Sequence, residues 1–240
     1  MDADLAFALS LADDADPIAL ARFRATDLRI DTKPDRTPVS EADRAVEERL
    51  RARIAAERPG ERVLGEELGE DAGDGPRWIV DPIDGTRNYT RGIPVWATLL
   101  ALEDRVAVVS APALGRRWWA TRGGGAFADG QPIGVSRIDR LEEATLLYAL
   151  DAPPPPRAFA AWHVRGFGDF WAHMLVAEGS ADVAVDAVGV TLWDLAAPKL
   201  IVEEAGGRFT DGGGLARADG GTAISSNGLL HDEALATLAK

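Results

Sequence analysis

The chain has 240 residues, which is long for one compact core and short for two independent domains. Apolar residues make up 46% and charged residues 27%, a balance that excludes collagen-like, disordered and disulfide-scaffold proteins. The formal net charge of −13 disfavours general binding to nucleic acid or to an anionic membrane surface. A phosphorylated substrate would therefore need local positive charge, from a metal ion or from a few basic side chains.

The absence of cysteine excludes disulfides, thiolate metal sites and cysteine nucleophiles. Residues 1–17 are acidic where a signal peptide would be basic. The longest apolar run, at 95–102, is far too short to cross a bilayer. We therefore expect a cytoplasmic protein that does not bind membranes.

The first part of the chain is predicted to be mainly helical. Apolar residues spaced among acids predict an amphipathic helix at 5–23, interrupted or restarted near Pro17. An alternating segment at 28–32 predicts a strand that runs into a turn at 33–34. A second helix with one apolar face is predicted from the Pro-Val-Ser opening at 38–40 to residue 57.

The middle of the chain is predicted to be rich in strands, because short apolar runs follow one another with turns between them. These predicted strands cover 62–64, 78–80, 95–101, 106–110, 117–121 and 125–128. The last part alternates helices and strands after a connecting segment, and a run of prolines excludes regular structure at 153–156. Its predicted elements are a helix at 169–178, a strand at 181–186, a helix at 193–205, a strand at 223–225 and a helix at 231–238.

These patterns predict one compact unit of mixed α+β and α/β class. Its N-terminal part, 1–137, is expected to carry most of the candidate metal ligands. Its C-terminal part, 138–240, is expected to carry Asp194 and the loops on the substrate side.

Acidic residues stand directly after the predicted strands and at two predicted helix starts. Glu66 and Glu67 follow the run 62–64, the sequence Asp-Pro-Ile-Asp-Gly-Thr at 81–86 follows the run 78–80, and Asp43 and Asp194 lie at helix starts. Carboxylates at strand ends are hard oxygen ligands for Mg²⁺, and the turn adds backbone carbonyls such as that of Ile83. The Gly85-Thr86 step then opens a segment whose N–H groups can hold a phosphate.

Each of these signals has a plain structural alternative when taken alone. Asp194 can be a helix N-cap, Asp43 a first-turn acid that favours the helix dipole, and Glu66-Glu67 part of a solvated loop. The turn at 81–86 is common turn chemistry. Their occurrence together, in this order, favours metal-assisted transfer of a phosphoryl group to water.

The motifs resemble those of the inositol monophosphatase superfamily of Mg²⁺-dependent, lithium-sensitive phosphatases. The resemblance rests on Trp-Ile-Val-Asp-Pro-Ile-Asp-Gly-Thr at 78–86, on Trp-Asp-Leu-Ala-Ala at 193–197 and on Glu-Ala-Gly-Gly at 204–207. The sequences Gly-Glu-Glu at 65–67 and Pro-Val-Ser-Glu-Ala-Asp at 38–43 fall in the family order. The resemblance implies a layered αβαβα sandwich of the inositol monophosphatase and fructose-1,6-bisphosphatase type.

The resemblance also implies a role for each matching residue. Glu66, Asp81 and the Ile83 carbonyl would bind a first Mg²⁺ ion, and Asp81, Asp84 and Asp194 a second. A third, weaker ion would lie near Glu66. Further implied roles are the activation of the attacking water by Thr86 and Asp43, and phosphate binding by Gly85, Thr86 and Lys33.

Within the superfamily, the sequence Asn-Tyr-Thr-Arg-Gly-Ile-Pro-Val-Trp-Ala-Thr at 88–98 resembles the bacterial histidinol-phosphate phosphatase branch. This branch hydrolyses L-histidinol phosphate to L-histidinol and phosphate in histidine biosynthesis. Ala187 stands where the inositol enzymes carry a substrate-binding glutamate, which disfavours inositol recognition. The alternatives are an inositol-1-monophosphatase or another small phosphate-ester phosphatase of the superfamily, and, less favoured, a non-catalytic metal-binding protein.

A substrate with a cationic amine and an imidazole ring suits a pocket with an acid and an aromatic side chain. Asp169 is the candidate for the amine, and Asp186 is a neighbouring acid that can serve the same end. Trp96 is a candidate for the apolar side of the pocket, although a buried tryptophan is more often core. Arg165 can touch the substrate, but an ion pair that orders the loop carrying Asp169 is favoured.

The remaining expectations concern histidine and assembly. His163, His173 and His231 lack metal-ligand spacing, so we expect structural roles, with His173 a candidate for a dimer contact or the edge of the pocket. The family resemblance implies a homodimer.

Overall fold

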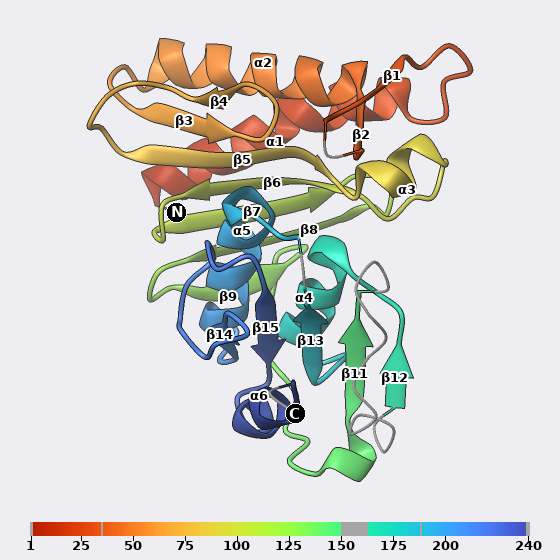
Figure 1. Cartoon of the computed structure of the whole chain (residues 1–240). Coiled ribbons are helices and arrows are strands. Elements are labelled where there is room, and N and C mark those ends of the chain that lie inside the picture. Colours follow the sequence, from red (N-terminus) through yellow and green to blue (C-terminus); the bar gives the residue numbers. More distant parts are fainter. Residues whose placement is uncertain (1, 35, 150–162, 188, 239–240) are drawn as a thin grey trace.

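The computed structural model describes residues 2–34, 36–149, 163–187 and 189–238. Helices and sheets alternate in layers from α1 and α2 at one end of the molecule to α6 at the other (Figure 1). The helices of the described residues are α1 (Ala3–Arg22), α2 (Glu41–Glu57), α3 (Thr86–Thr90), the 3₁₀ helix η1 (Leu141–Glu143), α4 (Asp169–Ala177), α5 (Leu192–Glu204) and α6 (His231–Leu238).

The larger sheet has the strand order β10-β9-β8-β7-β6-β5-β3-β4. Only β3 and β5 pair in parallel, and the other neighbours are antiparallel. Its strands are β3 (Arg62–Gly65), β4 (Gly69–Glu70), β5 (Arg77–Asp84), β6 (Ala97–Leu102), β7 (Val106–Ala111), β8 (Arg116–Thr121), β9 (Gly125–Ala128) and β10 (Gln131–Pro132).

The smaller sheet has the strand order β12-β11-β13-β15-β14. Strands β12, β11 and β13 are parallel to one another, and β15 joins them antiparallel. Its strands are β11 (Thr145–Tyr148), β12 (His163–Arg165), β13 (Val183–Asp186), β14 (Arg208–Thr210) and β15 (Ala223–Ser226). A separate ribbon pairs β1 (Ile30–Thr32) with β2 (Pro38–Ser40).

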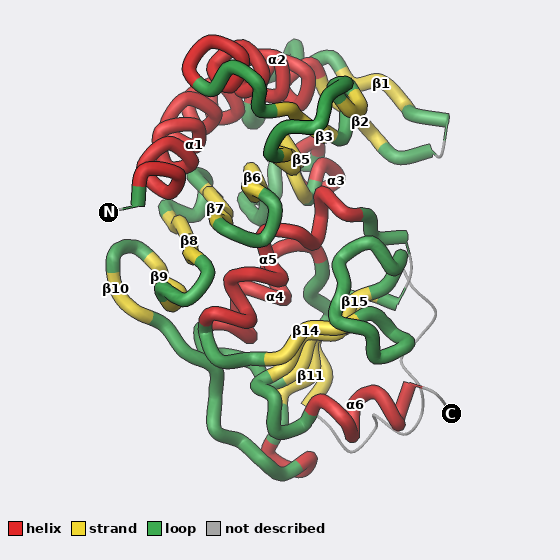
Figure 2. Tube along the Cα trace, turned by 90° about the vertical axis from the view of Figure 1, so that its left-hand side faces the viewer, coloured by secondary structure: helices red, strands yellow, loops and turns green. Residues whose placement is uncertain are grey.

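The helices fill the spaces around the two sheets with apolar side chains. One core lies between α1, α2 and the larger sheet, and it includes Leu11, Leu50 and Trp78. A second core, with Leu200 and Phe170, lies between the opposite face of that sheet and α4 and α5. The smaller sheet packs on α4 and α5 with one face and on α6 with the other, so the layers read α, β, α, β, α (Figure 2).

The expected layered sandwich is therefore confirmed, with local differences. Helix α1 is continuous through Pro17, because its face of buried apolar residues packs on α2, β6 and β7 and outweighs the lost N–H. The expected loop at 153–156 lies outside the described residues. The strands β2, β4, β10, β11, β12 and β14, with two to four residues each, were not predicted.

The carboxyl ends of parallel strands meet in the space between the two sheets. In the larger sheet, β3 and β5 end at Gly65 and Asp84. In the smaller sheet, β12 and β13 end at Arg165 and Asp186. Loops that follow parallel strands are therefore brought together there, which is where open α/β sheets bind ligands. No helix in the described ranges combines the length and the apolar character needed to span a membrane.

Candidate active site

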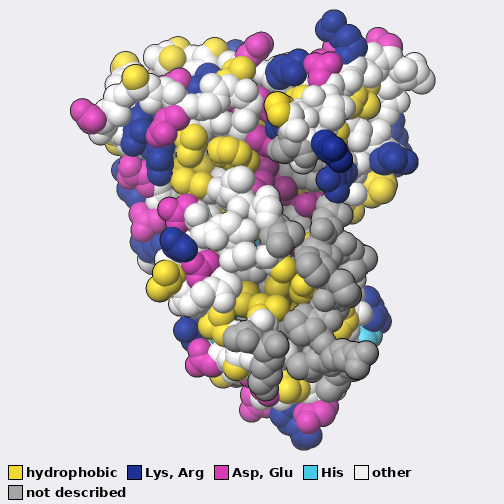
Figure 3. Space-filling view, in the orientation of Figure 1, with side chains coloured by type: hydrophobic (Ala, Val, Ile, Leu, Met, Phe, Trp, Pro, Cys, Tyr) yellow, Lys and Arg dark blue, Asp and Glu magenta, His cyan; other side chains and the backbone are white. Residues whose placement is uncertain are grey.

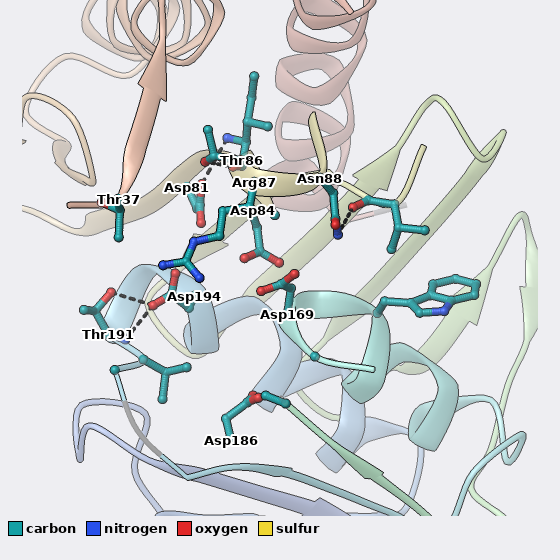
Figure 4. Close-up of a pocket in the computed structure, with 18 of the residues that line it drawn as sticks. Thr37, Asp81, Asp84, Thr86, Arg87, Asn88, Asp169, Asp186, Thr191 and Asp194 are labelled. Atoms are coloured by element: carbon teal, nitrogen blue, oxygen red, sulfur yellow. Dashed lines mark hydrogen bonds between the residues drawn. The ribbon is translucent and has the colours of Figure 1, made fainter. Parts of the chain in front are cut away.

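The carboxylates of Asp81, Asp84 and Asp194 converge. Each offers an oxygen atom, and these atoms all lie within 4.8 Å of one another. Asp81 and Asp84 come from the irregular end of β5, where the register with β6 shifts, and the backbone N–H of Ile83 donates to Asp81 Oδ1 at 3.0 Å. Asp194 comes from the first turn of α5 and lies beside Asp81 and Asp84 (Figure 4).

Asp194 is oriented by a capping box. Its Oδ2 accepts hydrogen bonds from the backbone N–H of Thr191 at 2.5 Å and from the Thr191 hydroxyl at 2.8 Å. The residue is therefore at the third position of the helix, rather than its N-cap, and the bonded oxygen fixes where the carboxylate points. Asp194 therefore both caps the start of α5 and belongs to the converging carboxylates, so the two interpretations of this residue in the sequence are compatible.

Asp43 is held in the same way at the start of α2. The backbone N–H of Ser40 donates to Asp43 Oδ2 at 2.9 Å, and the Ser40 hydroxyl donates to it at 2.6 Å. The other oxygen of Asp43 lies 3.3 Å from the Thr86 hydroxyl, which also lies 2.9 Å from the Ile83 carbonyl oxygen. The expected contact between Thr86 and Asp43 is present.

Asp84 is tied to the other half of the site. The backbone N–H of Phe170, in the first turn of α4, donates to Asp84 Oδ2 at 2.6 Å. The preceding residue, Asp169, adopts a left-handed φ of 55°, which few residues other than glycine, asparagine and aspartate tolerate. Figure 4 shows the Asp169 carboxylate facing Asp84 across the cavity.

Glu66 lies at the turn after β3, next to a lysine. Lys33 Nζ lies 2.6 Å from Glu66 Oε1 and 2.6 Å from Glu67 Oε1. Glu66 and Lys33 are both largely buried, so the ion pair is well shielded from solvent. The structure therefore brings Lys33 to the site, but to its carboxylates, where it neutralises part of their charge.

The site carries more negative charge than its own residues neutralise. Burial is the main cause that raises the pKa of Asp81 and Asp84 well above the usual range of a carboxyl, and neighbouring carboxylates raise both further. The pKa values of Glu66 and Asp194 are raised for the same first reason. Burial also raises the pKa of Asp43, to about 6, against the hydrogen bonds from Ser40.

This donor set fits hard divalent cations. The oxygen atoms of the buried Asp81 and Asp84 and of the partly buried Asp194 converge, and such carboxylates cost folding energy unless they are protonated, paired or bound to metal. The converging donors are oxygens, the ligands that Mg²⁺ and Ca²⁺ take, whereas softer metals favour nitrogen and sulfur. Figure 3 shows acidic side chains gathered in a hollow between the two halves of the molecule.

The cavity holds about 700 Å³ and has an acidic end and an aromatic side. Asp81, Asp84 and Asp194 lie together, Asp169 faces Asp84, and Asp186 lies on the side of the cavity away from Asp81 (Figure 4). Apolar contact comes from Phe167, Trp171 and Trp193, together with aliphatic residues such as Ile93 and Val95.

The prediction for Trp96 is wrong. Its side chain is fully buried in the core, with its ring centroid 5.0 Å from that of Tyr89 and 5.4 Å from that of Phe23. Trp96 belongs to the core between α1 and the larger sheet, whereas the preceding residue, Val95, lines the cavity. The Trp96 side chain therefore points away from the cavity. Phe167 and Trp171, which the sequence analysis did not single out, line the cavity instead.

Arg165 also lies elsewhere. It is exposed at the end of β12, where its guanidinium donates to the Val164 carbonyl at 3.0 Å and contacts the His163 ring. It is not among the residues that line the cavity, and no ion pair joins it to another of the described residues. The favoured role as an ion-pair partner for the Asp169 loop is not observed there.

Glu47 holds the turn that carries Glu66, a role that was not predicted from the sequence. It is fully buried on α2, and its carboxylate accepts hydrogen bonds from the backbone N–H groups of Glu67 at 2.8 Å and Leu68 at 3.1 Å. Gly65 leaves room for it, since a Cβ there would lie 2.0 Å from Glu47 Oε1. Its place in a charged helical segment gives no local sign of this role.

The expected roles of the histidines are partly confirmed. His173 is buried on α4 at the edge of the cavity, and His231 is buried at the start of α6. His231 lies 2.9 Å from the Thr210 hydroxyl and 2.9 Å from the Ser226 hydroxyl. His163 is exposed.

Comparison with known proteins places the chain among phosphatases. The model of the inositol monophosphatase family matches residues 1–240. The chain is 51% identical to a histidinol-phosphatase of Mycobacterium tuberculosis, over 98% of this chain and 97% of the relative, and 46% identical to a histidinol-phosphatase of Streptomyces coelicolor, over 98% and 96%. Among solved structures, a Thermotoga maritima IMPase superposes with a TM-score of 0.89 at 30% identity, over 98% of this chain and 96% of that chain.

Proposed function

The chain belongs to the inositol monophosphatase family, and from this premise we propose that it is a phosphoric monoester hydrolase that releases phosphate from L-histidinol phosphate. The observation that carries the proposal is the convergence of Asp81, Asp84 and Asp194 at one end of a cavity that Asp169 and Asp186 also line. The first set suits metal and phosphate, and the second suits a cationic substrate.

At the phosphate end, Glu66, Asp81, the Ile83 carbonyl, Asp84 and Asp194 would hold two or three Mg²⁺ ions. When bound, Mg²⁺ would polarise the phosphate and lower the pKa of a water ligand. The Thr86 hydroxyl, which lies within reach of Asp43, is positioned to accept a hydrogen bond from the attacking water and to pass on its own proton toward Asp43. Asp43 suits this role, because burial raises its pKa to about 6 and a carboxylate with a raised pKa is a better proton acceptor.

The phosphate itself would be held by the chain reversal after β5. Gly85 has a φ of 79°, and a Cβ there would lie 3.0 Å from the Val95 carbonyl oxygen, so glycine is required. The backbone N–H groups of Gly85 and Thr86 precede the hydrogen bonds of α3 and have no partner within that helix. We propose that these two groups donate to the phosphate oxygens.

The substrate amine would pair with Asp169, which faces Asp84, or with Asp186, which lies on the side of the cavity away from Asp81. Burial and the Asp169 charge are the first two causes that raise the pKa of Asp84, which indicates how close Asp169 lies to the reacting end. The aromatic side chains of Phe167 and Trp171 would pack against the imidazole ring. A polyol phosphate has no ammonium group to pair with these acids, and Ala187 offers no carboxylate to its hydroxyl groups.

The proposal is tested by the release of inorganic phosphate from L-histidinol phosphate and from inositol 1-phosphate, with and without Mg²⁺. We expect the histidinol ester to be preferred in kcat/KM by about 100-fold or more, as for a site that pairs a buried charge, and turnover to require the metal. A preference for inositol phosphate would assign the chain to the alternative activity. Binding of Mg²⁺ without hydrolysis of either ester would favour a non-catalytic protein.

We further propose that the enzyme acts in histidine biosynthesis in the cytoplasm as a homodimer, as the family resemblance implies. Lithium inhibition is expected on the same ground. Sedimentation at assay concentration tests the dimer directly, and a monomer under those conditions would contradict it.

A further inference from the structure

Three buried residues connect the floor of the cavity to the interior of the smaller sheet. His173 Nε2 lies 2.7 Å from Asp186 Oδ2, and His173 Nδ1 lies 2.8 Å from the Ser225 hydroxyl. The relative exposures of His173, Asp186 and Ser225 are 1%, 4% and 0%. The three side chains come from α4, β13 and β15, so the contact is made only by the folded layers.

The hydrogen bonds define what the histidine does. A carboxylate oxygen only accepts hydrogen bonds, so the 2.7 Å contact with Asp186 Oδ2 places a proton on His173 Nε2. The ring is also fixed by packing, with its centroid 5.7 Å from that of Phe209. His173 therefore presents one N–H, in one direction, to one oxygen of Asp186.

The second oxygen of Asp186 is directed elsewhere. Asp186 Oδ1 lies 3.9 Å from the position that a Cβ on Gly168 would occupy, so it faces the turn that leads into Asp169. Both Asp186 and Gly168 line the cavity, and Figure 4 shows Asp186 on the side of the cavity away from Asp81. Within the described ranges, His173 supplies the hydrogen bond that a side chain makes to Asp186.

We propose that His173 is a positioning residue for substrate selection: it fixes Asp186 so that Oδ1 accepts a hydrogen bond from the cationic end of the substrate. The inference rests on the proposed function, because it requires an ester with a positive charge remote from the phosphate. A buried carboxylate with one oxygen committed to His173 offers the amine its other oxygen as a single, defined acceptor.

If His173 positions Asp186, a change at His173 should affect the binding of substrates that carry a positive charge and leave other esters unaffected. His173→Leu removes the donor to Asp186 and keeps an apolar side chain against Phe209. We expect its KM for L-histidinol phosphate to rise about tenfold, as for one lost hydrogen bond to a charged group, with kcat changed less than about twofold. The KM for glycerol 1-phosphate, which has no positive charge, should stay at the wild-type value.

Three variants separate positioning from simple packing. His173→Gln keeps an N–H donor in reach of Asp186 and should recover most of the lost affinity. Asp186→Asn should give the same selective rise in KM. The double variant His173→Leu/Asp186→Asn should have the KM of Asp186→Asn alone, because both changes act through the same hydrogen bond between His173 and Asp186. Thermal unfolding of each variant records its effect on the fold.

An equal rise in KM for both esters, a loss in kcat instead of KM, or additive effects in the double variant would overturn the inference. If His173→Leu does not fold, Ser225→Ala replaces it, and a rise in KM for both esters there has the same meaning. Failure of the proposed function is distinguishable, since wild-type enzyme would then show no preference for L-histidinol phosphate over glycerol 1-phosphate.

Discussion

The two ends of the cavity are built in different ways. The phosphate end takes Asp81, Ile83 and Asp84 from the irregular end of β5 and Thr86 from the start of α3. Asp43 and Asp194 are added from the first turns of two further helices. The substrate end takes Asp169, His173 and Asp186 from α4 and the smaller sheet. The first end is a local motif reinforced by capping boxes, whereas the second exists only after two sheets and the intervening helices have packed.

This difference separates two kinds of selectivity. A metal site sees only the phosphate, so its ligands can be shared among enzymes with many substrates. The substrate end meets the rest of the ester and can change without disturbing the metal ligands. The link between them is the hydrogen bond from Phe170 to Asp84, because it places Asp169 next to the reacting end.

The largest effect is expected at the phosphate end. Asp84→Asn removes a charge from the converging carboxylates and should lower kcat by about 10³-fold or more on every ester, if charge stabilisation by bound metal supplies several kcal/mol. Without metal, the variant should be at least as stable as wild type, since the Asp84 carboxylate is buried beside like charges that raise its pKa. Phosphate release and urea unfolding measure the two effects.

The matched control for this variant is Asp74→Asn, at an exposed position outside the cavity. It removes the same charge from the chain and should leave both measurements unchanged. Full activity in Asp84→Asn would contradict the assignment of the phosphate end.

A smaller effect is expected from Gly65→Ala, which tests how the Glu66 turn is supported. A Cβ at residue 65 would lie 2.0 Å from Glu47 Oε1, so the buried carboxylate must move away from the N–H groups of Glu67 and Leu68. Overpacking of this kind costs about 1–3 kcal/mol, and the displaced turn should also weaken Mg²⁺ binding. Urea unfolding and calorimetric titration with Mg²⁺ measure the two losses.

Gly134→Ala is the control for that substitution, because a Cβ there meets the Ala205 carbonyl oxygen at an ordinary 3.6 Å. It should change neither quantity. Wild-type Mg²⁺ affinity in Gly65→Ala would show that the turn does not depend on Glu47.

The smallest effect concerns the far side of the smaller sheet. Burial lowers the pKa of His231 from 6.5 to about 4, so the folded state binds fewer protons than the unfolded state between these values. The stabilising effect of a neutral His231 is complete above the unfolded pKa and is lost as the pH falls below it. Between pH 7.5 and 5 the loss should be about 2 kcal/mol.

The buried carboxylates of the site have raised pKa values, so they stabilise the fold as the pH falls, opposite to His231. The His231 effect must therefore be obtained by comparing wild type with a variant that lacks this histidine. The free energy of unfolding is measured at both pH values for wild type and for His231→Asn. The variant should lack the part of the pH dependence that comes from His231. Identical pH dependence in the two proteins would contradict the burial of a neutral imidazole.

The convergence of Asp81, Asp84 and Asp194 could be predicted from the sequence, because most of the acidic motif is local. Asp81, Asp84 and Thr86 lie within six residues, and the capping positions of Asp43 and Asp194 follow from the residues that start their helices. The apolar periods likewise predicted the long helices and most central strands. The layered order of these elements came from the family resemblance.

Other parts depend on contacts between distant residues and could not be predicted locally. The expectation that Trp96 faces the substrate failed because its side chain, just before β6, packs into the core formed with α1. Glu47 and His173 act through partners that are distant in the sequence. Glu47 binds Glu67, 20 residues away, and His173 binds Ser225, 52 residues away. The strand pairs of β11 with β12 and β13 are too short to show a period.

The central claim is that the two ends of the cavity act separately, and Asp169→Asn tests it most directly. Asparagine tolerates the left-handed φ of 55° at this position, so the backbone should keep its conformation. The measurement is kcat/KM on L-histidinol phosphate and on glycerol 1-phosphate, at saturating Mg²⁺. We predict a fall of about tenfold or more for L-histidinol phosphate, from the lost pair between Asp169 and the ammonium group, and less than twofold for glycerol 1-phosphate, which has no ammonium group. An equal fall for both esters would show that Asp169 serves the phosphate end and would contradict the separation.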